Sequence, residues 1–171
     1  MPPEDIRLTP TSYIVLGFLE AMGEATPYDL KGAVNASVGN FWMLQHAQLY
    51  SEPERLARAG YLTEEREETG RRRKRYQVTA RGRRALEEWR DAPGDEVTRL
   101  RDLSLLKLFF GGDPAALAPV QLEAHRHKLA EYEAAAEQEL PPGMRMALES
   151  GLGHEREWVR FWEKMGRRRR R

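Results

Sequence analysis

Three short helical patterns followed by two β-favouring segments fill the first 79 residues, and this order constrains the fold more than any other feature. The first pattern, residues 9–22, and the second, residues 26–38, each open with a Thr-Pro pair. Threonine caps helix starts and proline suits the first helical position, so both pairs predict helix N-termini. The third pattern, residues 46–60, ends at a glycine that favours a helix stop.

Residues 61–79 predict a hairpin with a basic loop. Tyrosine, valine and threonine, which favour strands, occur in residues 61–63 and 75–79, and the intervening loop reaches the all-basic run Arg71–Arg75. Thr79 is placed to cap a further helix over residues 80–91. Three helices, a strand, a basic loop and a strand are the order of a winged helix-turn-helix.

The second half of the chain predicts three more helices, over residues 96–110, 115–140 and 143–165, with Gly/Pro segments between them. Each has an apolar stripe that must be buried, either against a second copy or against the winged domain. We therefore expect a mainly α chain: an N-terminal winged helix-turn-helix DNA-binding domain with a two-stranded wing (residues 1–92), a C-terminal helical dimerisation region (93–166) and a disordered basic tail (167–171).

The basic loop is a candidate phosphate-binding element, although the net charge of the whole chain is only +1. Every charged residue from Arg71 to Arg84 is basic, and glutamates flank this segment on both sides. Because a field fades over a Debye length of about 8–10 Å, a neutral total can conceal a strongly basic face. Arginine and lysine neutralise phosphates, and arginine also probes the minor groove. The alternative is a solvated charge run.

The start of the third helix is the candidate base-reading element. In a helix-turn-helix, the first turn of the recognition helix enters the major groove. Gln45, His46, Gln48 and Ser51 are polar residues there, and glutamine can pair with adenine through two hydrogen bonds. The alternative is a polar helix end that faces water.

The sequence offers no catalytic or metal-binding constellation. The chain has no cysteine, so thiolate metal sites and disulfides are excluded. His125 and His127 lie two apart on a helix, which directs them to different sides. No nucleophile-base order or phosphate-binding glycine loop is evident. We expect neither an enzyme nor a cofactor or metal.

The sequence also favours a cytoplasmic protein without a membrane partner. The acidic start, residues 1–5, lacks the basic and apolar regions of an export signal. No apolar stretch approaches the roughly 20 residues that span a bilayer.

Trp158 and Trp162 are spaced four apart and share one helix face. Aromatic residues at this spacing more often form core or interface than a ligand site. If a dimer interface contained a cavity, however, these rings would offer flat surfaces on which a small aromatic or phenolic effector could stack.

With these residues laid out, the chain resembles the PadR family of transcriptional regulators. The resemblance covers nearly the whole chain, and its combination of motifs is more specific than any one of them. The matching segments are LTPTSYIVLGFL at 8–19, TPYDLK at 26–31, Trp42 with QLY at 48–50, Leu56 with Gly60, GRRRKRYQVTARGRRAL at 70–86 and LESGLGHEREWVRFW at 148–162.

The resemblance implies a homodimeric winged-helix protein that binds double-stranded DNA and is usually a repressor released by a small molecule. It implies that Tyr28 and Tyr50 approach the sugar-phosphate backbone, that residues 45–51 read bases, that the wing follows the minor groove and that the last helix pairs with the partner subunit. The residues expected to contact DNA are Tyr28, Lys31, Gln45, His46, Gln48, Tyr50, Ser51, Arg71, Arg72, Arg73, Lys74 and Arg75.

The third helix departs from the family pattern. Members commonly carry proline directly after the tyrosine and an apolar residue two positions later, whereas this chain has Ser51 and Pro53. Because proline inside a helix removes a backbone hydrogen bond, either the helix is kinked or it begins later than the pattern suggests. The alternative function is a dimeric protein-interaction adaptor without specific DNA binding.

Overall fold

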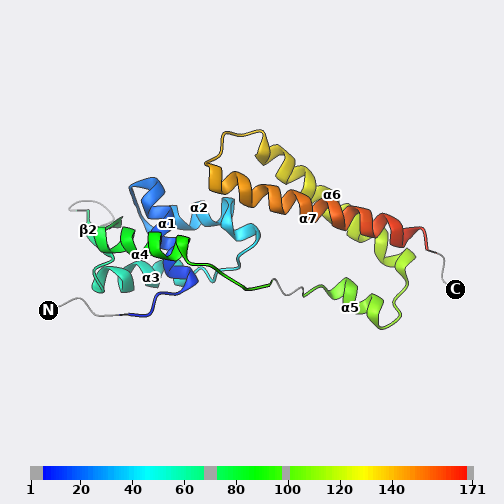
Figure 1. Ribbon diagram of the computed structural model, residues 1–171, viewed down its shortest axis with the longest axis horizontal. Coiled ribbons are helices and arrows are strands. Elements are labelled where there is room, and N and C mark those ends of the chain that lie inside the picture. The colour runs from blue at the N-terminus through cyan, green and yellow to red at the C-terminus, as the bar shows by residue number, and fades with distance from the viewer. Residues whose placement is uncertain (1–5, 68–72, 98–100, 169–171) are drawn as a thin grey trace. The chain divides into compact units, whose positions relative to one another are not determined.

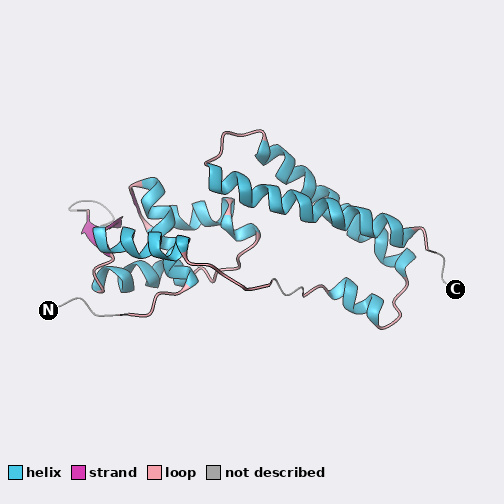
Figure 2. Ribbon diagram, in the orientation of Figure 1, coloured by secondary structure: helices cyan, strands magenta, loops and turns pink. Residues whose placement is uncertain are grey.

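The computed structural model describes residues 6–67, 73–97 and 101–168, and the chain divides into two compact units, residues 1–96 and 97–171 (Figure 1). Helices dominate both units, and the strands lie in the first (Figure 2). The elements of the first unit are α1 (Pro10–Met22), β1 (Glu24–Ala25), α2 (Pro27–Ala36), the 3₁₀-turn η1 (Val38–Asn40), α3 (Gln48–Arg58), β2 (Leu62–Arg66), β3 (Lys74–Val78) and α4 (Ala80–Asp91). Those of the second are α5 (Leu103–Phe109), α6 (Pro114–Ala136) and α7 (Pro142–Gly166).

Side-chain caps begin α1, α2 and α4 at the predicted residues. The hydroxyl of Thr9 accepts a hydrogen bond from the Ser12 amide, and Thr26 caps α2 in the same way. Thr79 Oγ1 accepts from the amide of Gly82 at 3.1 Å. These bonds satisfy N–H groups that lack a partner within the first helical turn, so the local sequence is enough to fix where each helix starts.

The sheet has three antiparallel strands in the order β1-β3-β2. The predicted hairpin is confirmed, with Leu62 opposite Val78 and Glu65 opposite Arg75. Strand β1 was not predicted, because two residues are too few to show an alternating pattern. It follows Gly23, whose φ of 79° lies in the left-handed region that glycine adopts at little cost.

The core of the first unit lies where α1, α2, α3 and α4 meet the sheet. Leu16, Leu30 and Leu56 are completely buried there, as is Tyr76 of the central strand. Helix α4 approaches closely because Gly82 has no side chain: a Cβ atom there would lie 2.3 Å from the Tyr61 carbonyl oxygen. The mainly α winged helix-turn-helix prediction is therefore confirmed.

The second unit consists of a long hairpin, α6 and α7, and the short helix α5 (Figure 1). The predicted helix over residues 96–110 is wrong at its start, since residues 96, 97, 101 and 102 are not helical and α5 begins at Leu103. The side chain of Asp102 accepts hydrogen bonds from the amides of Ser104 at 2.6 Å and Leu105 at 2.9 Å, which fixes the start there. Helices α6 and α7 pack around Trp162, Ala118 and Met165.

Within the described ranges, no helix is long and apolar enough to cross a bilayer.

Candidate nucleic-acid interface

Helix α3 begins two residues later than the sequence pattern suggested. Gln45 and His46 lie in the turn before the helix, where their carbonyl oxygens accept hydrogen bonds from the amides of Gln48 at 2.9 Å and Leu49 at 3.1 Å. Ala47 at the cap position has no side-chain acceptor, so these tight turn bonds start the helix instead. The later start is one of the two alternatives raised by Pro53, although Pro53 itself still lies inside α3.

The polar residues at this helix start are all exposed. The side-chain oxygen of Gln48 accepts a hydrogen bond from the Gln45 amide at 3.3 Å, which leaves the NH₂ group of Gln48 to donate elsewhere. The Ser51 hydroxyl donates to the Ala47 carbonyl at 3.2 Å. The turn and the first helical turn therefore present hydrogen-bonding groups held in place by local bonds.

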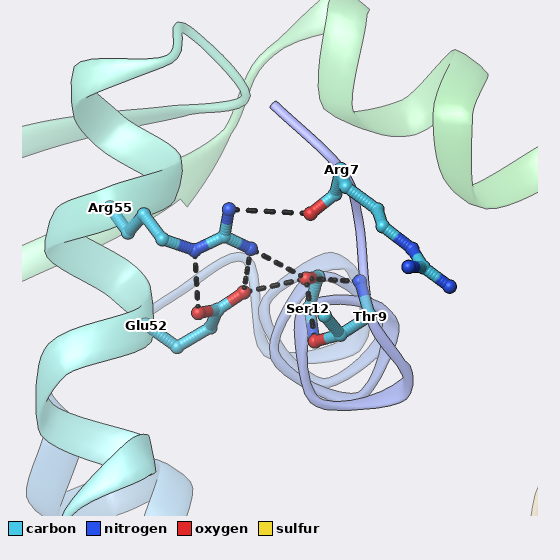
Figure 3. A network of polar contacts seen from close by, with 5 residues as sticks. All are labelled: Arg7, Thr9, Ser12, Glu52 and Arg55. Atoms are coloured by element: carbon cyan, nitrogen blue, oxygen red, sulfur yellow. Dashed lines mark hydrogen bonds and ion pairs between the residues drawn. The ribbon is translucent and has the colours of Figure 1, made fainter. Parts of the chain in front are cut away.

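Helix α3 is tied to the start of α1 by a network of polar side chains, which sequence reasoning did not identify (Figure 3). Arg55 donates to the carboxylate of Glu52 through Nε at 2.9 Å and through Nη2 at 2.6 Å. The hydroxyl of buried Ser12 donates to the same carboxylate at 2.5 Å and accepts from Arg55 at 3.1 Å. Arg55 also donates to the Arg7 carbonyl at 3.3 Å.

The environment of Glu52 favours its charged form. Burial alone would raise the pKa of this carboxyl, but the hydrogen bonds from Arg55 and Ser12 outweigh it and lower the pKa below the ordinary value. The i,i+3 spacing of Glu52 and Arg55 was the only local signal in the sequence, and it did not reveal the third partner, Ser12, 40 residues away.

Helices α2 and α3 and strand β3 enclose an open cleft of about 640 Å³. Tyr28, at the start of α2, is 74% exposed, and Tyr50 of α3 is 47% exposed. Both tyrosines line the cleft, together with Thr26, Pro27, Glu54, Arg73, Lys74 and Tyr76. Lys31 lies one helical turn beyond Tyr28 and is partly buried. The structure thus brings one face of α3, the start of α2 and the root of the wing together.

The wing residues differ in their environment. Arg73 is exposed and lines the cleft. Lys74 forms ion pairs with Glu54 of α3 and with Glu64 of β2. Arg75 pairs with Glu24 of β1 at 2.8 Å and with Glu67 at 3.5 Å. Arg71 and Arg72 lie outside the described residues.

Beyond the wing, Arg81 of α4 packs against the segment that joins α3 to β2. Its guanidinium lies 4.3 Å from the centre of the Tyr61 ring and donates to the Ala59 carbonyl at 3.0 Å. Arg83 and Arg84 are exposed.

The two candidate effector residues lie in the core of the second unit. Trp162 is completely buried, and its indole N–H has no acceptor among the described residues. Trp158 stacks on His125 of α6, with ring centres 5.5 Å apart. Phe161 contacts both indoles edge to face. This packing agrees with the expectation that aromatic residues four positions apart on a helix more often form core than a ligand site.

The histidines of α6 pair with carboxylates. His125 Nδ1 lies 2.6 Å from Glu155, and His127 Nε2 lies 3.0 Å from Glu131. Among the described residues, no group of three or more His, Asp or Glu side chains could hold a metal ion.

Comparison with known proteins agrees with the fold. The model of the transcriptional regulator PadR-like family matches residues 15–88. The negative transcriptional regulator PadR of Bacillus subtilis (strain 168) is 28% identical to this chain over 152 residues, which cover 83% of this chain and 82% of that protein.

Two solved structures of the B. subtilis protein are similar to this one. PadR in complex with operator DNA has a TM-score of 0.79 and 25% identity, covering 90% of this chain and 96% of that one. PadR in complex with p-coumaric acid has a TM-score of 0.74 and 24% identity, covering 90% of this chain and 95% of that one. The family resemblance is confirmed: at residues 15–88, the chain carries a domain of the PadR-like family of transcriptional regulators.

Proposed function

We propose that this protein is a cytoplasmic, sequence-specific DNA-binding repressor that acts as a homodimer on a pseudo-palindromic operator and is released by a small aromatic effector. The observation that carries the proposal is the cleft between α2, α3 and the wing, where two exposed tyrosines and Arg73 accompany the exposed start of α3. The B. subtilis relative, which shares this fold, was crystallised with operator DNA.

The proposed contacts divide into backbone and base contacts. Tyr28, Tyr50 and Lys31 face the sugar-phosphate backbone, and the basic residues Arg71–Arg75 meet phosphates along the wing. Residues 45–51 read base edges in the major groove, because their polar groups are exposed and locally held. Phosphate contacts fix position and affinity, whereas base contacts supply sequence information.

Exposed apolar side chains in the second unit support the homodimer. Phe109 is 81% exposed and Phe110 is 77% exposed, and both lie at the end of α5, which also exposes Leu103 and Leu106. A cluster of large apolar side chains in water is unfavourable, so a partner subunit is expected to cover it. Two-fold symmetry of the dimer then requires two half-sites related by the same symmetry, and we expect them about one helical turn apart.

The aromatic cluster of the second unit supports the proposal that a small aromatic effector binds there. The relative was crystallised with p-coumaric acid, a phenolic compound. Here the rings of Trp158, Phe161 and His125 contact one another, and the completely buried N–H of Trp162 beside them has no acceptor among the described residues. A planar acid that opened this packing would stack between the rings and accept that hydrogen bond.

The proposal is tested by titrating labelled DNA from the region upstream of the gene with the protein at several salt concentrations. DNA binding through phosphates gives a log affinity that falls with log salt by about 0.9 per phosphate contact. Replacing Arg71, Arg72 and Arg73 with alanine should weaken binding to all sequences alike. A slope near zero for the unmodified protein contradicts the proposal and favours a protein-interaction adaptor.

A further inference from the structure

The described part of the wing is electrically balanced by carboxylates. Its root carries four basic residues, and four glutamates lie among them: one each from β1, β2 and α3, and one that follows β2. Arg66, Lys74 and Arg75 form ion pairs with these glutamates, which are Glu24, Glu54, Glu64 and Glu67. The fourth basic residue is Arg73, which is exposed. A cation that already holds a carboxylate attracts a phosphate less than a free cation does.

Glu54 differs from the other three because it belongs to helix α3. Its carboxylate bonds directly to the ammonium of Lys74, so it joins the recognition helix to the wing across the cleft. Glu64 lies farther from that ammonium, at 3.4 Å, and also accepts hydrogen bonds from Tyr76 at 3.1 Å and from Arg66 at 3.2 Å. Glu54 is thus the principal counter-charge of Lys74, and Glu64 is shared among several donors.

We propose that Glu54 shields Lys74 from DNA phosphates and so lowers the affinity of the protein for DNA. This inference rests on the proposed function of DNA binding. In the free protein, Glu54 holds Lys74 in an ion pair at the edge of the cleft lined by Tyr28 and Tyr50. A DNA phosphate must compete with this carboxylate for Lys74.

The consequence follows from counterion release. When a free lysine binds a phosphate, a condensed cation leaves the DNA and the entropy gained favours binding. When a paired lysine binds, its carboxylate is left without a partner and attracts a cation from solution, which cancels that gain. DNA that docks loosely leaves the ion pair of Glu54 and Lys74 in place, whereas an operator that seats α3 in its groove brings the backbone close enough to displace Glu54. Because the operator complex loses the whole ion pair, Glu54 weakens operator binding at least as much as non-operator binding.

The experiment compares Glu54→Gln with the matched variant Glu65→Gln in titrations of operator and random-sequence DNA. Glu65 is exposed on the same hairpin and has no ion pair among the described residues, so its replacement removes the same charge without freeing a cation. We expect Glu54→Gln to steepen the salt slope for the operator by up to about 0.9, which corresponds to an affinity gain of up to roughly eightfold at 0.1 M salt. The gain for random-sequence DNA should be smaller, so the ratio of operator affinity to random-sequence affinity rises.

The same substitution in a protein that lacks Lys74 distinguishes the release of Lys74 from the general effect of removing a negative charge. In a Lys74→Gln protein, Glu54→Gln should no longer steepen the slope, because the cation that it frees is absent. Equal effects of Glu54→Gln and Glu65→Gln, or an unchanged effect in the Lys74→Gln background, overturn the proposal. If the unmodified protein shows no salt-dependent DNA binding, the proposed function fails; if it binds DNA and Glu54→Gln leaves the slope unchanged, only the shielding fails.

Discussion

Replacement of Glu52 by glutamine should destabilise the attachment of α3 to α1. The Glu52 carboxylate accepts hydrogen bonds from the Ser12 hydroxyl at 2.5 Å and from two nitrogens of Arg55 at 2.9 and 2.6 Å (Figure 3). Glutamine keeps the shape of the side chain but loses its charge and one acceptor atom. At least one bond to Arg55 is therefore lost, and the others become weaker.

The size of the destabilisation by Glu52→Gln follows from the burial of the two side chains. The Glu52 side chain is 12% exposed, so its lost bonds are not replaced by water, whereas the Arg55 side chain is 32% exposed and recovers part of its hydration. A hydrogen bond to a charged group contributes about 1.5–3 kcal/mol, and the recovered hydration of Arg55 reduces the loss to about 2 kcal/mol.

Amide hydrogen exchange of peptides from α1 and α3 measures this change as a free energy of local opening. The protein concentration must be constant, since dimerisation shifts apparent stability. Glu20→Gln is the matched control, because Glu20 of α1 pairs with Arg90 of α4 across two helices of the same unit, but both side chains are more exposed. An exposed pair contributes about 0–1 kcal/mol, so the control should change little. Equal effects of the two variants would refute the reasoning from burial.

The pH dependence gives an independent check with a definite sign. Because the folded-state pKa of Glu52 lies below its ordinary value of 4.5, the contribution of its charged form is fully present above that value. It is lost as the pH falls through the folded-state pKa. The difference in stability between the unmodified protein and Glu52→Gln should therefore be constant near neutral pH and shrink below about pH 4.5. A difference that grows in acid would contradict the assignment.

Two further predictions concern close packing and the aromatic cluster. Gly82→Ala should lower the free energy of unfolding by about 1–3 kcal/mol, because the new methyl group would overlap the Tyr61 carbonyl. Gly32→Ala, where nothing lies within 4 Å, should instead raise it by up to about 1 kcal/mol through helix propensity, and urea denaturation compares the two. Addition of p-coumarate should quench tryptophan fluorescence with a saturable dependence that weakens in Trp158→Phe, and linear quenching in both proteins would argue against an effector site there.

Local chemistry explains which parts of the fold could be predicted. The starts of α1, α2 and α4 were correct because each depends on a threonine that bonds to an amide three residues away. The start of α3 was wrong because Ala47 offers no such acceptor and the turn is set by backbone bonds instead. Strand β1 exists because β3 pairs with it, and the short sequence of Glu24 and Ala25 carries no pattern of its own.

The DNA-contacting residues proposed from the sequence show the same difference between what local sequence predicts and what tertiary contacts decide. Tyr28 and Tyr50 were proposed from the family resemblance and Arg73 from the basic loop, and the structure places all three around one cleft. The ion pairs of the wing could not be predicted from the sequence. A run of basic residues specifies charge, but whether Lys74 of strand β3 is free depends on Glu54, which lies 20 residues earlier on helix α3.

The sequence by itself determined the order of elements, the capped helix starts and the concentration of basic residues in one loop, because these depend on residues within a few positions of one another. Only the tertiary structure decided which carboxylates neutralise that loop, how Ser12 holds α3 and where Trp162 is buried. These interactions join residues that are distant along the chain, and they arise only when folding brings the residues within hydrogen-bonding or van der Waals distance.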